Sequence, residues 1–351
     1  MIRAGMLGAL LFVAGACATT PPPVITGENS GAAPTIAELV QPLPVPPSGT
    51  GDIVAPPVTA PEIDRPALSP EPPPKLIVCQ GPAMQGGVIL CATEPHAELT
   101  LDDVPVAVAD AAGIAVIGLS RKQPSPATIR FRTSLEAPVA YSRRIAAASV
   151  DIIERQDVVS AFKMDCSKIA AQTPAQKRHA EVSWVKKDAA LKRFNPALAP
   201  VAFVKPAEGP YSSPFGAVRT YLPTSDDCEP STSVHNGLDI AVPTGSAIRA
   251  PMAGTVILAD PDLYYEGGCV FLDHGRGLVS VFMHLSEIGV AAGDVIRQGE
   301  LLGRSGATGR VTGPHLHWAI KYRNVTSPDR GTDTWLDPSL VLQLDSATLA
   351  P

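Results

Sequence analysis

GPHLHW, at residues 313–318, is the stretch of this sequence that decides its fold. The apolar run continues through residues 319–320, so the segment is predicted to be a β-strand. Side chains alternate between the two faces of a strand, and His315 and His317, two residues apart, therefore share one face. Two imidazoles on the same face of a strand indicate a groove in which they act together.

Two further strings carry histidines, HNGLDIAVP at residues 235–243 and VFMHL at 281–285. In the first, three residues including a glycine separate His235 from Asp239, which fits a turn entering a strand better than a helix. In the second, His284 follows a short apolar run. Four of the seven histidines thus lie in three short strings.

Asp239 and two of these histidines meet the needs of a hydrolytic zinc ion. Such an ion takes three nitrogen or oxygen ligands from the protein and keeps a fourth position for water. The other two histidines, with ordinary pKa values of about 6.5, are suited to accept and return a proton. Together the three strings predict an open, catalytic zinc site.

The chain from about residue 212 to 338 resembles the lysostaphin-type zinc metallopeptidases, which cut the peptides of peptidoglycan. The motifs that carry the resemblance are SSPFGAVR at 212–219, HNGLDIAVPTGSAIRAPMAGTV at 235–256, VFMHL at 281–285 and GRSGATGRVTGPHLHW at 303–318. Their order and spacing also fit that family.

The resemblance implies a role for each residue of the cluster. His235, Asp239 and His317 would bind one Zn²⁺ ion. His284 and His315 would position and deprotonate the attacking water or stabilise the developing oxyanion. Because all five positions are filled, we expect an active zinc endopeptidase that hydrolyses peptide cross-links of peptidoglycan.

Two other functions use the same residues. Family members that have lost ligands activate other cell-wall hydrolases, so a non-catalytic, groove-binding activator is the alternative. A structural zinc is the second possibility, and the lack of a fourth protein ligand argues against it, since structural sites are closed and cysteine-rich. The bond cleaved, either D-alanyl to diaminopimelate or one in a glycine bridge, depends on the shape of the groove.

Glycines punctuate short apolar runs around these motifs, which predicts brief strands and tight turns. We expect a mainly β peptidase domain at 199–342, whose antiparallel sheet the resemblance implies, and a tail at 343–351. Loops at 220–234, 260–268 and 305–313 would line the groove. The first loop is acidic, which indicates either a contact for amino groups of the substrate or a solvated loop.

Residues 1–17 have the features of a secretory signal, with a basic start, an apolar core at 7–13 and small residues before Cys17. The apolar core is too short to span a membrane. VAGAC, at 13–17, resembles a bacterial lipobox, and cleavage without lipidation after Ala16 is the alternative. We expect an exported, periplasmic protein, anchored to the outer membrane through lipid on Cys17.

Residues 18–74 contain 16 of the chain's 37 prolines. Such a composition buries too little apolar surface to order itself, so we expect a disordered, Pro-rich tether. At about 3.1 Å per residue its reach would be on the order of 170 Å.

A second folded unit is expected at residues 75–150. The run at 85–122 is similar to the immunoglobulin-like module that precedes the peptidase in some bacterial members, which implies a small β-sandwich with a positioning or binding role. Short apolar runs between Gly, Pro and Asp turns predict its strands. They lie at 76–78, 88–91, 98–101, 104–108, 114–119, 128–132 and 139–143.

A helical connector is expected at residues 151–198. Thr173 and Gln176 have the spacing of a capping box, with Pro174 at the first helical position, and a helix-permissive run follows to Phe194. The segment is locally basic in a chain of net charge −6, which indicates either contact with anionic wall polymers or a solvated face. Peptidoglycan stem peptides are the expected partners, and no nucleic acid is expected.

Five cysteines follow the signal, without a Cys-x-x-Cys pair. Cys79 and Cys91 are predicted to bridge neighbouring strands of the first β unit. In the resemblance Cys228 and Cys269 both flank the groove, which implies a second disulfide between them. Cys166 would then remain a free thiol.

Overall fold

The computed structural model describes residues 77–132, 146–171, 173–327 and 330–349. The signal, Cys17, the tether and the strand expected at 139–143 lie outside the described residues. Among the helices in the described part of the chain, none has the length and apolar character to cross a membrane.

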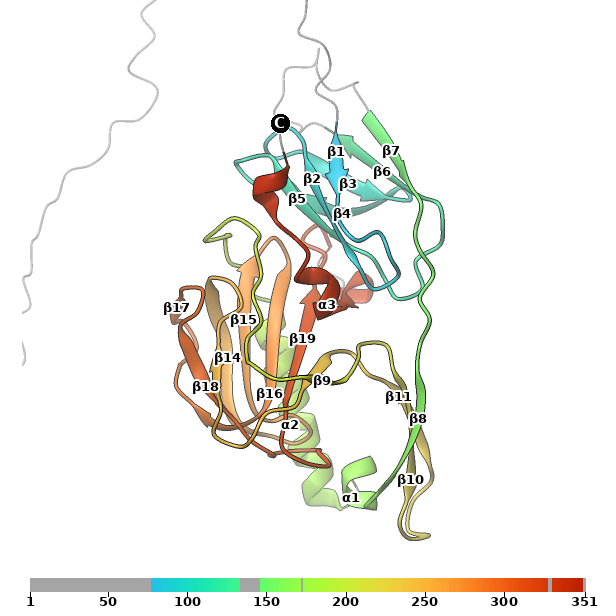
Figure 1. The fold of residues 1–351 in the computed structure, drawn as a ribbon, viewed down its shortest axis with the longest axis vertical. Coiled ribbons are helices and arrows are strands. Elements are labelled where there is room, and N and C mark those ends of the chain that lie inside the picture. Colours follow the sequence, from blue (N-terminus) through green and yellow to red (C-terminus); the bar gives the residue numbers. More distant parts are fainter. Residues whose placement is uncertain (1–76, 133–145, 172, 328–329, 350–351) are drawn as a thin grey trace, which may run out of the picture. The chain divides into compact units, whose positions relative to one another are not determined.

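The peptidase region is a mainly β structure built on one large antiparallel sheet, as the sequence predicted (Figure 1). Its main path runs in the order β17-β14-β15-β16-β19-β12-β9, with β13, β18 and β20 attached. The strands are β9 (Tyr211–Ser213), β12 (Leu238–Ile240), β13 (Ala247–Arg249), β14 (Gly254–Leu263), β15 (Gly267–Gly275), β16 (Leu278–Ile288), β17 (Val295–Ile296), β18 (Leu301–Ser305), β19 (Leu316–Tyr322) and β20 (Thr334–Leu336).

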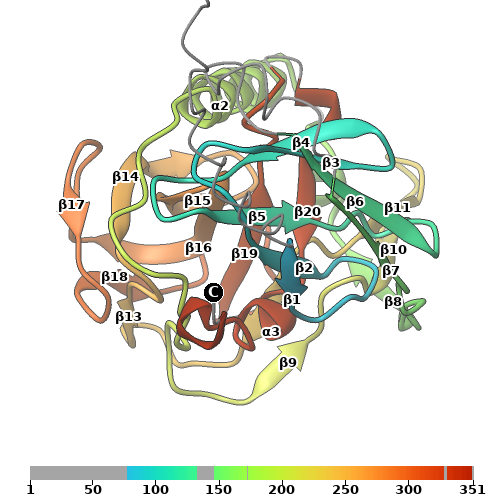
Figure 2. The same cartoon turned by 90° about the horizontal axis from the view of Figure 1, so that it is seen from above.

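Both faces of this sheet are covered, so its central strands are apolar on both sides. On one face, Phe282 and Trp318 belong to the main core. On the other, Phe271 and Val281 pack with Leu191 at the end of α2 (Pro174–Leu191), the helix that crosses the upper part of Figure 2. Alternating residues of neighbouring strands therefore serve two separate cores.

The predicted helix is confirmed with its cap. Thr173 accepts from the backbone N–H of Gln176, and the Gln176 side chain accepts from the backbone of Thr173. This reciprocal pair satisfies two donors at the helix start. The helix ends at Leu191, three residues before the expected Phe194.

The first β unit has two sheets, in the orders β1-β2-β5 and β4-β3-β6-β7, with a buried cluster formed by both. Its strands agree with the predicted positions within a few residues, and β7 is additional. They are β1 (Val78–Gln80), β2 (Val88–Ala92), β3 (Glu98–Leu101), β4 (Val104–Val108), β5 (Ile114–Gly118), β6 (Ala127–Arg132) and β7 (Ala146–Val150).

Strand β2 is apolar on both faces for the same reason as the central peptidase strands. Ile89 and Cys91 belong to the cluster of the first unit, whereas Val88 and Leu90 belong to the peptidase core. The Tyr322 hydroxyl also donates to a backbone carbonyl of the first unit, that of Val106, at 2.6 Å. The first unit thus closes one side of the peptidase core.

The segment expected to be a helical connector also contains a strand. Strand β8 (Val159–Met164) pairs in parallel with β10 (Val218–Pro223), which pairs antiparallel with β11 (Ser231–Val234). A short helix, α1 (Cys166–Ile169), follows β8. The remaining short helices, α3 (Pro338–Val341), η2 (Arg330–Thr332) and η3 (Ser346–Thr348), lie near the end of the chain.

The cysteine pairing requires one correction. Cys79 and Cys91 form a disulfide between directly paired residues of β1 and β2. Cys228 pairs with Cys166, so the expected bridge between Cys228 and Cys269 is wrong. The pairing of β8 with β10 brings the ends of the two strands together. Each of these two cysteines follows one of those ends. Cys269 is a buried free thiol, and burial raises its pKa above the ordinary value.

His274 predicts a loss of stability in acid. Its ring is 0 % exposed, and burial lowers its pKa to about 4 despite its hydrogen bond with the Ala253 carbonyl and the charge of Asp273. The unfolded chain, with a histidine pKa of about 6.5, takes up this proton first. The free energy of unfolding should therefore keep its full value above pH ~6.5 with respect to His274. It should fall by about 3 kcal/mol as the pH drops to ~4.

Denaturant unfolding of His274→Gln and the wild type at pH 7, 5.5 and 4 measures this effect. The difference between the two free energies of unfolding should change with pH, while His179→Gln, a partly exposed control, follows the wild type. A constant difference would contradict the prediction.

Candidate metal centre and groove

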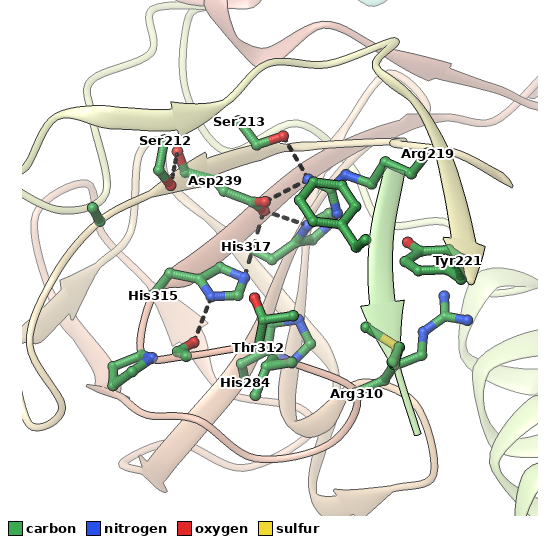
Figure 3. Close-up of a pocket in the computed structure, with 16 residues that line it drawn as sticks. Ser212, Ser213, Arg219, Tyr221, Asp239, His284, Arg310, Thr312, His315 and His317 are labelled. Atoms are coloured by element: carbon green, nitrogen blue, oxygen red, sulfur yellow. Dashed lines mark hydrogen bonds and ion pairs between the residues drawn. The ribbon is translucent and has the colours of Figure 1, made fainter. Parts of the chain in front are cut away.

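Three of the predicted residues form a buried cluster. His235 follows β11 directly, Asp239 lies in β12, and His317 lies opposite Asp239 in the pairing of β12 with β19. The Oδ1 atom of Asp239 is 3.0 Å from His235 Nε2 and 2.9 Å from His317 Nδ1, and those two nitrogens are 3.0 Å apart. Strand pairing therefore places the three side chains at one point (Figure 3 shows Asp239 and His317).

The donor set fits a divalent metal ion. One potential ligand atom from each residue lies within 4.8 Å of the other two. The Nδ1 atom of His235 is 2.7 Å from the Pro214 carbonyl, to which it can only donate, so Nε2 is the nitrogen that faces the cluster. Gly237 makes room for the site, since a Cβ there would lie 2.5 Å from the Nε2 atom of His317.

Asp239 is held as a carboxylate. Burial by itself raises its pKa, but hydrogen bonds with His235 and His317 and the charges of these rings lower it well below the ordinary value. The guanidinium of Arg219, on β10, donates to its second oxygen at 2.7 Å and to the Ser213 hydroxyl at 2.6 Å. The carboxylate thus stays ionised and fixed in orientation.

His284 and His315 lie beside this cluster, and their ring centroids are 5.0 Å apart. Each Nδ1 is 2.9 Å from a backbone carbonyl, that of Thr308 for His284 and that of Gly313 for His315. A carbonyl only accepts, so each Nδ1 carries a proton, and in a neutral ring Nε2 keeps its lone pair. The His315 Nε2 atom is 3.7 Å from Asp239 Oδ1, at the edge of the cluster.

His284 is held neutral by its surroundings. Burial lowers its pKa to about 3, and the neighbouring His317 and His315 rings add to this effect. Its backbone is left-handed, with φ of 66°, which a non-glycine residue adopts only when the surrounding structure enforces it. The lone pair of this neutral ring can accept a hydrogen bond from a water molecule.

A groove of two cavities passes the cluster. One has a volume of ≈ 340 Å³ and the other ≈ 230 Å³. Their shared lining residues are Arg219, Tyr221, His284, Arg310 and His317. The cluster therefore lies where the two cavities meet, so an extended peptide could reach it from both sides.

Part of this groove is formed by residues to which the sequence assigned no role. Phe162 and Met164, from β8, line the larger cavity. Arg219 lies in the quoted SSPFGAVR motif and Arg310 in GRSGATGRVTGPHLHW, but neither received a role. The three loops expected at the groove do contribute, whereas the acidic residues at 226, 227 and 229 are exposed and line neither of these cavities.

Replacing Arg219 tests its hold on Asp239. In Arg219→Gln we expect metal affinity to fall about 10- to 100-fold, as is typical when the hydrogen-bond partner of a ligand is removed. Competition with a coloured chelator measures the affinity, and Arg249→Gln, on the exposed part of β13, is the control. Unchanged affinity in Arg219→Gln would show that Asp239 is oriented without Arg219.

The chain is similar to known peptidases in sequence and fold. The model of peptidase family M23 matches residues 233–329. A solved structure from Pseudomonas aeruginosa, assigned to peptidase M23, is 31% identical with a TM-score of 0.51, and the match covers 74% of this chain and 95% of that one. Fold and site thus define a peptidase. The chain belongs to peptidase family M23.

Curated relatives match only part of their own length. The peptidoglycan DD-endopeptidase ShyA of Vibrio cholerae is 39% identical over 89 residues, which cover 25% of this chain and 20% of ShyA. The DD-carboxypeptidase/endopeptidase Mpg of Neisseria meningitidis is 34% identical over 117 residues, which cover 33% of this chain and 26% of Mpg. The chain thus spans about a fifth to a quarter of the length of these relatives.

Proposed function

We propose that this protein is a zinc-dependent endopeptidase that hydrolyses peptide cross-links of peptidoglycan. One observation carries the proposal: a His-Asp-His cluster and two further histidines meet at the junction of two cavities. The names of ShyA and Mpg support peptidoglycan as the substrate. The filled ligand and proton-transfer positions favour an enzyme over a non-catalytic activator.

The ligands of the ion would be His235 through Nε2, Asp239 through its carboxylate and His317 through Nδ1. When bound, zinc supplies a Lewis acid that polarises the scissile carbonyl and lowers the pKa of water to about 7. The carboxylate of Asp239 compensates part of the charge of the ion. Its bond with Arg219 keeps the ligand in place.

The chain's own groups would move the protons. His315 Nε2, at the edge of the cluster, accepts a proton from the attacking water, and His284 lies next to it to position this water. As the oxygen adds to the carbonyl carbon, the carbon–nitrogen bond breaks and the proton passes to the leaving nitrogen. The products are one new carboxylate and one new amine.

We also propose that the protein acts outside the cytoplasm. A signal with a lipidated Cys17 would attach it to the outer membrane, and the Pro-rich segment at 18–74 would let the peptidase reach the wall from the periplasm. The first β unit at 75–150 would position the peptidase, since it closes one side of the peptidase core.

Incubation of the purified protein with isolated sacculi and cross-linked muropeptide dimers tests the enzyme. We expect mass spectrometry to detect monomers with zinc, none after chelation, and recovery when zinc is restored. Intact dimers under all three conditions, with zinc bound to the protein, would contradict the proposal.

A further inference from the structure

We propose that Arg310 is a receptor for a substrate carboxylate beside the scissile bond. The inference rests on the proposed endopeptidase function and deepens it, because it selects one class of peptide. It follows from the position of Arg310, from its aromatic contacts and from the distribution of charge in the groove.

Two tyrosines hold the Arg310 side chain in place. Its guanidinium carbon lies 5.3 Å from the ring centroid of Tyr221 and 5.0 Å from that of Tyr265. Its backbone N–H also donates to the Tyr265 carbonyl at 2.8 Å. A guanidinium against aromatic faces keeps its N–H groups in its own plane, where they can form two parallel bonds to a carboxylate.

Arg310 lines both cavities that meet at the cluster. It does so together with His284 and His317 (Figure 3 shows the Arg310 side chain beside that of Tyr221). A carboxylate bound to Arg310 would therefore sit close to the atoms that hold the metal and carry the proton. Such a carboxylate belongs to a residue that flanks the scissile amide.

Charge pairing distinguishes Arg310 from the other charged residues of the groove. Across the described ranges, no carboxylate forms an ion pair with it, whereas Arg219, the other arginine shared by both cavities, is paired with Asp239. Glu266, which lines the smaller cavity, is paired with Lys187. The unmatched charge at Arg310 thus favours an anionic group from the substrate.

The need for a carboxylate beside the scissile bond distinguishes between the two types of cross-link that the sequence left open. A diaminopimelate residue joined through its side-chain amine keeps a free carboxylate on the carbon that bears this amine. A glycine bridge carries no carboxylate next to its internal amides. A carboxylate receptor at Arg310 therefore favours cleavage of the bond between D-alanine and diaminopimelate.

A matched pair of substrates tests the inference. Two synthetic cross-linked peptides would be identical except that the diaminopimelate carboxylate is a carboxamide in one. We expect the zinc-loaded wild type to prefer the carboxylate about 10- to 100-fold in kcat/KM, as for a charged hydrogen-bond pair. The preference should fall to about 1 in Arg310→Gln and be partly kept in Arg310→Lys.

Arg297→Gln is the matched control, because the Arg297 side chain is 88% exposed and lines neither cavity. It should keep the wild-type preference. If Arg310→Gln lowers kcat/KM for both peptides by the same factor, the ratio persists. Arg310 would then only support Tyr221 and Tyr265, and the inference would be overturned.

Measurements of peptide binding test the role of Arg310 independently of the endopeptidase proposal. If the wild type cleaves neither peptide, the proposed function fails, but calorimetry still compares their affinities for zinc-loaded His315→Ala. Tighter binding of the carboxylate peptide, lost when Arg310→Gln is added, supports the receptor. Equal binding of the two peptides would overturn it.

Discussion

Replacing Asp239 with alanine should remove zinc binding and peptide hydrolysis together. Its carboxylate is the only negative charge among the three proposed ligands and bonds to both histidines. Loss of an outer hydrogen-bond partner already costs about 10- to 100-fold in metal affinity, so loss of the ligand itself should exceed 100-fold. Elemental analysis after dialysis and the muropeptide assay measure the two losses.

The same change also leaves the partly buried Arg219 without its charge partner, so folding has to be checked. Asp239→Asn keeps the shape of the side chain while removing its charge, and thermal unfolding monitors both variants. Asp226→Ala, in the exposed turn after β10, is the control. A folded Asp239→Ala protein that retains one zinc ion and its activity would exclude Asp239 as a ligand.

Replacing His315 with alanine should separate catalysis from metal binding. The ring is proposed to transfer a proton rather than to hold the ion, so zinc content should stay near one equivalent. Removal of a general base typically lowers the rate about 10²- to 10⁴-fold, and kcat/KM should fall by that amount.

His179→Ala, on α2, is the matched control for this variant and should behave as the wild type. Loss of zinc in His315→Ala would make His315 a ligand. Retention of both zinc and full activity would leave His284 as the base. A cellular phenotype that survives the combined loss of His284 and His315 would favour the activator function.

The sequence predicted those parts of the site that are local in the chain. The last three residues of GPHLHW begin β19, with His315 just before the strand, and the pairing of β19 with β12 places His317 opposite Asp239. The capping box of α2 and most strands of the first β unit were also found, because each depends on residues a few positions apart.

Contacts between distant segments could not be predicted in this way. Strand β8 has mostly exposed side chains and no regular alternation, so its parallel pairing with β10 has no local signal. The disulfide of Cys166 with Cys228 depends on that pairing, which is why it was missed. Likewise, the apolar run of β2 indicated burial but not that two different cores would share it.

The pairing of β8 with β10 also determines at which residue a shortened form of the peptidase can begin. The family match begins at residue 233, yet Arg219 and the strand beside it precede that point. A shortened protein without residues 159–164 would expose the edge of β10, and open strand edges template association between molecules. A fusion protein that carries this peptidase region would therefore have to include the segment from β8 onward.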